Sequence, residues 1–250
     1  MTPNDRFSQS TVLHLDEIGS TNAEALRLSG TGERGPLWIV ADRQTAARGR
    51  SGRSWTSPPG NLSASYLFDP GCQPENLHQL ALLTGVAVHA AVHRTTHSTI
   101  PGLRLKWPND LLIGSAKVAG ILVETTTWAG KTVAIIGIGV NIVASPGISG
   151  RETTSLGAHA PGATRDALLA ALRSEIDNWL LIWRAGAGFH DIRTAWLERA
   201  GLVGERLTVN GDKGPIEGEY IGIDENGALL LRNSDGLVRR LTYGDVNLVT

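Results

Sequence analysis

RQTAARGRSGRSW, residues 43–55, is the stretch around which the rest of the chain is organised. Its arginines are Arg43, Arg48, Arg50 and Arg53, although the formal net charge of the whole chain is only −1. Gly49 and Gly52 make the stretch a poor helix, and its charge makes it a poor core strand. Because it follows the apolar residues 37–41 (LWIVA), we expect a loop that leaves a buried strand.

The chemistry of this loop suits an anionic ligand. Guanidinium forks and backbone N–H groups exposed by glycine both bind phosphates and carboxylates well, and Trp55 adds a flat face for a base or ring. A solvated basic turn is the alternative, and it is the better interpretation of such a run taken alone. A second polar stretch further along the chain makes the ligand site the better interpretation.

Composition limits the classes of protein to consider. The chain has 250 residues, of which 41% are hydrophobic and 19% are charged, as in a globular protein with one large domain and a small one. Its near-zero net charge argues against a general nucleic-acid or membrane-surface protein. The single cysteine, Cys72, excludes a disulfide scaffold, and the seven histidines show no metal-binding spacing. Because a signal peptide and an apolar run of bilayer length are both missing, we expect a cytoplasmic enzyme or binding protein without a membrane partner.

Short turns between strands, with long helices set apart from them, predict an α+β fold. We expect strands over residues 12–15, 37–41, 62–68, 103–107, 111–113, 117–124 and 132–143. Tight turns join the last of these, so we expect an antiparallel sheet rather than βαβ units. Apolar periodicity predicts helices over residues 74–93, 165–183 and 189–200. The cluster Ser20, Thr21 and Asn22 predicts a helix N-cap, whose hydroxyl and N–H groups also suit a small polar ligand.

The last fifty or so residues consist of short strand-like runs separated by turns. They predict a small β-barrel, near the lower size at which a domain folds alone. Expected strands lie within residues 206–209, 214–223, 227–232 and 237–244. We place the boundary near Gly201, which gives a larger domain over residues 1–201 and a smaller one over residues 202–250.

Two lysines and Asp110 form the second polar stretch. Lys106 ends a strand just before a proline turn that contains Asn109, and Lys117 begins the next strand. A strand lysine is costly to bury without an anionic partner, and Asp110 is suited to orient an amine, accept its proton or bind magnesium. Taken singly, these are better interpreted as surface lysines and a turn aspartate. Together with the arginine-rich stretch of residues 43–55, called the arginine loop below, they indicate a site for a phosphate-bearing ligand.

A third stretch, GIGVN at residues 137–141, combines glycines with a polar end. Gly137 and Gly139 would let a flat ligand approach the strand backbone, and Asn141 is suited to read an adenine edge. A bulged core strand with an exposed Asn141 is the alternative.

In order and spacing, these stretches resemble the motifs of the biotin protein ligases, the biotin–[acetyl-CoA-carboxylase] ligases, from about Ile18 to the end of the chain. The motifs are GSTN at 19–22, AARGRSGRSW at 46–55, KWPND at 106–110, KVAGIL at 117–122 and GIGVN at 137–141. The resemblance implies a class II synthetase-like catalytic domain, with helices on a mixed or antiparallel sheet, and an SH3-like barrel. It also implies ATP and biotin as substrates, a magnesium ion, and the biotin carrier domain of a carboxylase as partner.

The resemblance also assigns roles to single residues. Biotin would contact Ser20, Thr21, Asn22, Gln44, Arg48, Gly49, Arg50 and Lys117. ATP would contact Arg53, Trp55, Lys106, Asn109 and Asn141, with Trp55 over the adenine and both asparagines reading it. The catalytic residues would be Arg50, Lys117 and Asp110, with Asp110 beside the incoming lysine amine or a magnesium ion.

The chain departs from the family pattern at two places. Ala47 stands where the family usually has the first glycine of its loop. With a positive φ there, alanine would cost roughly 1 kcal/mol or more; with a negative φ it would only add a methyl group near the ligand. The GSTN motif begins at Gly19, which leaves no room for the N-terminal DNA-binding helices of some relatives, so we expect no DNA partner.

Two other functions stay open. A lipoate–protein ligase resembles this family in fold and adenylate chemistry, although the arginine loop and the GSTN motif favour biotin. A non-catalytic module that contacts RNA or an acidic partner is the other, and the modest net charge counts against it. The sequence leaves the oligomeric state open between a monomer and a weak homodimer.

Overall fold

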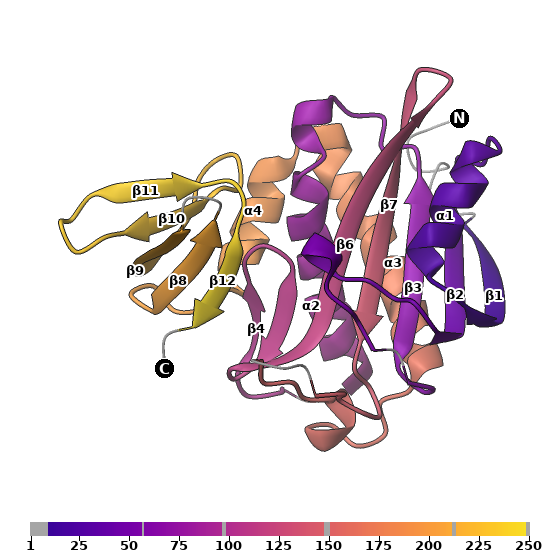
Figure 1. The fold of residues 1–250 in the computed structure, drawn as a ribbon, viewed down its shortest axis with the longest axis horizontal. Helices are drawn as coiled ribbons and strands as arrows, with labels where there is room; N and C mark the ends of the chain where they lie inside the picture. The colour runs from indigo at the N-terminus through magenta and orange to yellow at the C-terminus, as the bar shows by residue number, and fades with distance from the viewer. Residues whose placement is uncertain (1–9, 57, 97–98, 148–150, 212–213, 249–250) are drawn as a thin grey trace.

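The computed structural model describes residues 10–56, 58–96, 99–147, 151–211 and 214–248. Two sheets organise these residues (Figure 1): a large one in the order β1-β2-β3-β7-β6-β5-β4 and a small one in the order β11-β10-β9-β8-β12. The large sheet consists of β1 (Thr11–Ile18), β2 (Leu37–Gln44), β3 (Leu62–Phe68), β4 (Leu103–Lys106), β5 (Asp110–Ile113), β6 (Ala116–Trp128) and β7 (Lys131–Val140). The helices are α1 (Thr21–Gly30), α2 (Gln79–Thr96), α3 (Arg165–Trp183) and α4 (Phe189–Leu197). The predicted α+β class is confirmed.

Helices cover both faces of the large sheet, because its central strands are apolar on both sides. Figure 1 shows α1 in front of the sheet and α2 and α3 behind it. Alternate residues of β2 face the two layers: Trp38 belongs to the core shared with α2 and α3, and Ile39 to the smaller core under α1. All seven residues of β3 are buried between the two layers. The two cores therefore fix the register of the sheet that carries the site.

The first strands add a parallel pair to the antiparallel strands expected between residues 103 and 143, which are confirmed. β1 pairs with β2 in parallel, with Thr11 opposite Leu37, so β1, α1 and β2 form a βαβ unit. The expected strand over residues 12–15 was too short to reveal this pairing, because the real strand runs on to Ile18. The sheet is mixed, since every other pairing within it is antiparallel.

Helix positions agree with the periodicity in two of three cases. The helix predicted over residues 165–183 has those bounds, and the one predicted over residues 189–200 ends at Leu197. The helix predicted over residues 74–93 is divided into a 3₁₀ turn, Pro74–Asn76, and α2, which runs to Thr96. No helix among the described residues is both long and apolar enough to cross a membrane.

The small sheet consists of β8 (Arg206–Gly211), β9 (Gly214–Ile223), β10 (Leu229–Arg232), β11 (Val238–Leu241) and β12 (Asp245–Leu248). Sequence analysis missed β12, which is short and pairs only with the distant β8. The boundary predicted near Gly201 lies in the connection between α4 and β8. Buried residues of both sheets nevertheless belong to one continuous core, and this places β12 next to the β4–β5 turn.

Candidate active site

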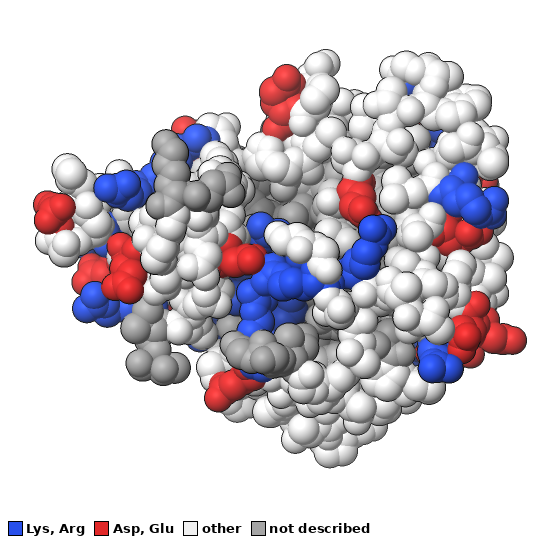
Figure 2. Space-filling model, in the orientation of Figure 1, with Lys and Arg blue, Asp and Glu red and all other residues white. Residues whose placement is uncertain are grey.

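An open cavity lies between the two sheets. Its walls come from α1, the loop after β2, the β4–β5 turn, β6, β7 and β12. Figure 2 shows basic side chains gathered in this hollow beside the small domain. Of the residues predicted to form a site, the cavity is lined by Ser20, Thr21, Asn22, Gln44, Arg48, Gly49, Arg50, Arg53, Trp55, Lys106, Asn109, Asp110 and Lys117. Segments distant in sequence thus meet at one place, as the motifs predicted.

One end of the cavity is a buried polar pocket at the start of α1. Ser20 caps the helix, as its sequence predicted. The N–H and hydroxyl groups of Thr21 both donate to Oε1 of Gln44, at 2.8 and 3.1 Å. Because these bonds occupy the amide oxygen of Gln44, its Nε2 group remains as a hydrogen-bond donor for a ligand.

Asn22 is held from two sides in the same pocket. Its Nδ2 donates to Oε2 of Glu124 at 2.7 Å, and its Oδ1 accepts from the Ser65 hydroxyl at 2.5 Å. Gly137 makes room for this amide, because a Cβ at that position would lie 2.3 Å from Asn22 Oδ1. Glu124 and Ser65 were not among the predicted site residues, since nothing in their local sequence indicates this long-range contact.

Asp110 lies between two lysines deeper in the cavity. Its carboxylate accepts from Lys117 Nζ at 2.5 Å and pairs with Lys106 Nζ at 3.2 Å. Burial on its own would raise the pKa of Asp110, but the two ammonium groups lower it to about 2. Burial also lowers the pKa of Lys106, which Asp110 counteracts. The strand lysine therefore has the anionic partner that its burial requires.

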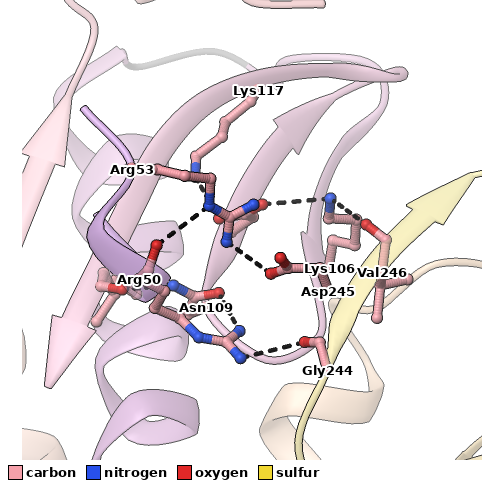
Figure 3. A network of polar contacts seen from close by, with 10 residues as sticks. Arg50, Arg53, Lys106, Asn109, Lys117, Gly244, Asp245 and Val246 are labelled. Carbon is pink, nitrogen blue, oxygen red and sulfur yellow. Dashed lines mark hydrogen bonds and ion pairs between the residues drawn. The ribbon is translucent and has the colours of Figure 1, made fainter. Parts of the chain in front are cut away.

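The small domain holds the arginine loop (Figure 3). Arg53 pairs with Asp245 of β12 at 2.6 Å, and Arg50 donates to the carbonyl of Gly244 at 3.1 Å. Arg50 also donates to Oδ1 of Asn109 at 3.1 Å, and Lys106 donates to the carbonyl of Val246 at 3.0 Å. Asp245 is the site residue that sequence analysis missed most clearly, because the strand that carries it was itself not predicted.

The Trp55 indole packs closely against glycines of β6 and β7. A Cβ at Gly139 would come within 2.6 Å of the indole, and one at Gly120 within 3.4 Å. Lys117 Nζ lies 5.4 Å from the centroid of the same ring, a cation–π contact. We expected the glycines of residues 137–141 to admit a flat ligand; in this structure they admit an indole and the Asn22 amide.

The loop backbone resolves the question raised by Ala47. Ala47 is not among the residues with positive φ, so alanine carries no backbone strain there, and its carbonyl accepts from the N–H of Trp55 at 3.1 Å. The left-handed positions are Ser51, with φ of 55°, and Gly52, with φ of 71°.

Asn141 does not line the cavity. Its side chain is buried, where Nδ2 donates to the carbonyl of Thr154 at 3.1 Å and Oδ1 accepts from Asn61 at 3.4 Å. This arrangement does not support the prediction that Asn141 reads an adenine edge. It supports a structural role, in which Asn141 fixes the segment after β7 beside the cavity.

The magnesium role predicted for Asp110 does not fit its surroundings. Both carboxylate oxygens already face ammonium groups, which would repel a second cation. Among the described residues, no group of three or more histidine, cysteine, aspartate or glutamate side chains is arranged to hold a metal ion. The cavity is therefore built for anions rather than for a protein-bound metal.

Comparisons with known proteins agree with this chemistry. Residues 17–141 match the biotin/lipoate A/B protein ligase family, and residues 202–249 match the biotin protein ligase C-terminal domain. The biotin–[acetyl-CoA-carboxylase] ligase of Paracoccus denitrificans is 35% identical over 89% of this chain and 94% of its own length. A bifunctional ligase/repressor of Bacillus subtilis is 29% identical over 95% of this chain and 74% of its own length. The structure of the Aquifex aeolicus biotin protein ligase with biotin and ATP superposes with a TM-score of 0.81, at 29% identity over 96% of this chain and 98% of that one.

The Asp110 ion pairs predict an acid-sensitive component of stability. The pKa of Asp110 lies below the roughly 3.9 of an unfolded aspartate. Its contribution is therefore fully present above about pH 4 and is lost as the pH falls toward 2, by on the order of 2 kcal/mol. Urea unfolding at pH 5, 4 and 3 should show this component in the wild type and in the exposed-site control Asp235→Asn. Asp110→Asn should lack it, and an unchanged pH slope in that variant would contradict the assignment.

The ion pair between Arg53 and Asp245 should hold the arginine loop against the small domain and protect it from proteolysis. Asp245→Asn should release the loop and speed trypsin cleavage after Arg48, Arg50 and Arg53 several-fold, without lowering the unfolding temperature much. Because Arg53 and Asp245 are 37% and 29% exposed, high salt should partly mimic the substitution. Asp235→Asn serves as the matched control. Equal cleavage rates in both variants would show that the ion pair does not hold the loop.

Proposed function

This chain belongs to the biotin/lipoate A/B protein ligase family, and we propose that the cavity between its two sheets is the site of its chemistry. The chain is a biotin protein ligase: it activates biotin with ATP to biotinyl-5′-AMP and transfers the biotinyl group to a protein lysine. The predicted family and reaction are thereby confirmed. The roles assigned to individual residues of the cavity are our proposal.

One observation carries the assignment of the site: a buried polar pocket and a cationic wall share one cavity. The wall contains the six cations Arg48, Arg50, Arg53, Lys106, Lys117 and Arg151 and the two carboxylates Asp110 and Asp245. This leaves a formal excess of four positive charges in a chain of net charge −1. The reaction joins a carboxylate to a polyphosphate, and such fixed cations stabilise the charge that gathers in its transition state.

The polar pocket suits the ureido ring of biotin. Ser20, Thr21 and Gln44 offer hydroxyl and amide groups at the ring, and the Asn22 amide is fixed by Glu124 and Ser65. The dithiolane ring of lipoate offers no hydrogen bonds and would leave this buried polar wall unpaired. The pocket therefore favours biotin over lipoate.

In the first step, a carboxylate oxygen of biotin attacks the α-phosphorus of ATP. The new C–O–P linkage forms as the bond to the β-phosphate oxygen breaks, and pyrophosphate leaves with the electron pair. Arg48, Arg50 and Lys117 would stabilise the reacting carboxylate and α-phosphate, with the backbone of residues 48–50 around the ligand. Arg53 and Lys106 would bind the outer phosphates.

ATP has to replace contacts that the loop makes in this structure. Arg53 would exchange Asp245 for a phosphate, and Asn109 would exchange Arg50 for the adenine, which Trp55 covers. Magnesium, in this proposal, arrives with the phosphates of ATP rather than on Asp110, as is common for this ion. The loop then closes over the biotinyl-AMP, whose mixed anhydride would otherwise hydrolyse.

In the second step, the neutral lysine amine attacks the carbonyl carbon, and AMP leaves as the amide forms. Asp110 is suited to position this amine and Lys117, but its pKa of about 2 makes it a weak acceptor for the proton. The protein partner in our proposal is a biotin carrier domain of a carboxylase, in keeping with the name of the Paracoccus relative. A monomer or weak homodimer and a cytoplasmic location stay predictions.

The decisive experiment is biotin-dependent exchange of labelled pyrophosphate into ATP, with no carrier protein present. Exchange that requires both biotin and magnesium would establish reversible formation of biotinyl-AMP by this chain. Exchange with lipoate in place of biotin would move the substrate assignment to the sister ligases. If no exchange occurred with either biotin or lipoate, the adenylation chemistry would be refuted and a binding role would be favoured.

We expect Lys117→Ala and Arg50→Ala each to lower the exchange rate more than tenfold, because each removes a cation from the reacting phosphate. Lys131→Ala, at the exposed start of β7, is the matched control and should behave as the wild type. Melting temperatures of all three variants separate lost chemistry from lost folding. Wild-type exchange in both site variants would refute the assignment of the cationic wall.

A further inference from the structure

Arg151 is a cation of the cavity that lies outside all five sequence motifs. It follows β7 by about ten residues, lines the cavity and is half-buried. No pattern in its neighbourhood singled it out, because it belongs to a segment without regular helix or strand. Its position comes entirely from how that segment is attached to the sheet.

Backbone bonds fix the segment beside Lys117. The N–H of Lys117 donates to the carbonyl of Glu152 at 2.9 Å, and the N–H of Thr154 donates to the carbonyl of Lys117, also at 2.9 Å. The buried amide of Asn141 donates to the carbonyl of Thr154 at 3.1 Å. Arg151 therefore extends from a fixed backbone, adjacent to a lysine already assigned to the reaction.

Most of the inner cations of the cavity have partners among the residues that the structure describes, and Arg151 has none among them. Lys106 and Lys117 pair with Asp110, Arg53 with Asp245, and Arg50 donates to Asn109 and Gly244. Within the described ranges, the Arg151 guanidinium has neither a hydrogen bond nor an ion pair. The Arg48 side chain has no such partner there either, but Arg48 is more exposed to solvent than Arg151. A half-buried guanidinium without an acceptor in a cavity for anions is a group that a ligand would satisfy.

The electrostatic neighbours of Arg151 indicate which part of the ligand it meets. Burial lowers the pKa of Lys106 and of Arg50, and the positive charge of Arg151 lowers both further. Arg151 therefore shares the cavity with Lys106, which would hold the outer phosphates, and is near enough for its charge to act on that lysine.

We propose that Arg151 binds the β- and γ-phosphates of ATP and stabilises the pyrophosphate leaving group. This inference rests on the proposed adenylation site and extends it by a residue from a segment that none of the motifs contains. As the α–β P–O bond breaks, negative charge develops on the β-phosphate oxygen, and a guanidinium within reach lowers the energy of that state. The second step involves no pyrophosphate, so it does not depend on Arg151.

This difference between the two steps provides the test. Arg151→Gln should lower both biotin-dependent pyrophosphate exchange and the pyrophosphorolysis of added biotinyl-AMP by tenfold or more, with a raised KM for pyrophosphate. The same variant should transfer biotin from added biotinyl-AMP to hydroxylamine within twofold of the wild-type rate, with unchanged biotin affinity. Arg151→Lys, which keeps the charge but not the planar fork, should recover part of the loss.

Arg239→Gln, on the exposed strand β11, is the matched control for removing an arginine charge. Equal losses in pyrophosphorolysis and in transfer would overturn the proposal, because they would place Arg151 at the α-phosphate or in the support of the fold. Wild-type rates throughout would overturn it as well. Failure of exchange in the wild-type chain itself would instead refute the proposed function, so the two failures are distinguishable.

Discussion

The carboxylate of Asp110, buried between Lys106 and Lys117, is the interaction on which the site depends. Each of the three charges would be costly to bury alone, and together they fix the ends of β4, β5 and β6 at one point. Both lysine side chains thereby line the cavity beside the arginine loop. A single carboxylate at the β4–β5 turn thereby organises the cationic wall without neutralising it.

Around that point, internal contacts occupy side chains that the proposed ligand would use. Arg53 pairs with Asp245, Arg50 with the Gly244 carbonyl, and the Trp55 indole lies on Gly139. These contacts are partly exposed and individually weak, so an ATP molecule with stronger charge-assisted bonds is able to replace them. In the proposed reaction, the small domain therefore holds the loop until ATP binds to its arginines.

Local sequence was sufficient for the parts of the structure that depend on neighbours in the chain. Hairpin turns, the apolar period of α3 and the N-cap at Ser20 were predicted correctly, and thirteen of the fourteen predicted site residues line the cavity. Contacts between distant segments were not predictable: the parallel pairing of β1 with β2, the strand that carries Asp245, and the partners of Asn22. Asn141 shows the difference well, since its residue type suggested a ligand contact, whereas its burial against Thr154 gives it a structural role.

The continuous core between the two sheets limits how the molecule is able to move. Trp107 donates from its buried indole to the Gly227 carbonyl, and Arg193 of α4 donates to the Ile223 carbonyl of β9. With such bonds and shared apolar packing, the small domain does not swing as a hinged lid. We therefore expect any opening of the cavity to come from movement of the arginine loop, and heat or denaturant should unfold both sheets in one cooperative transition.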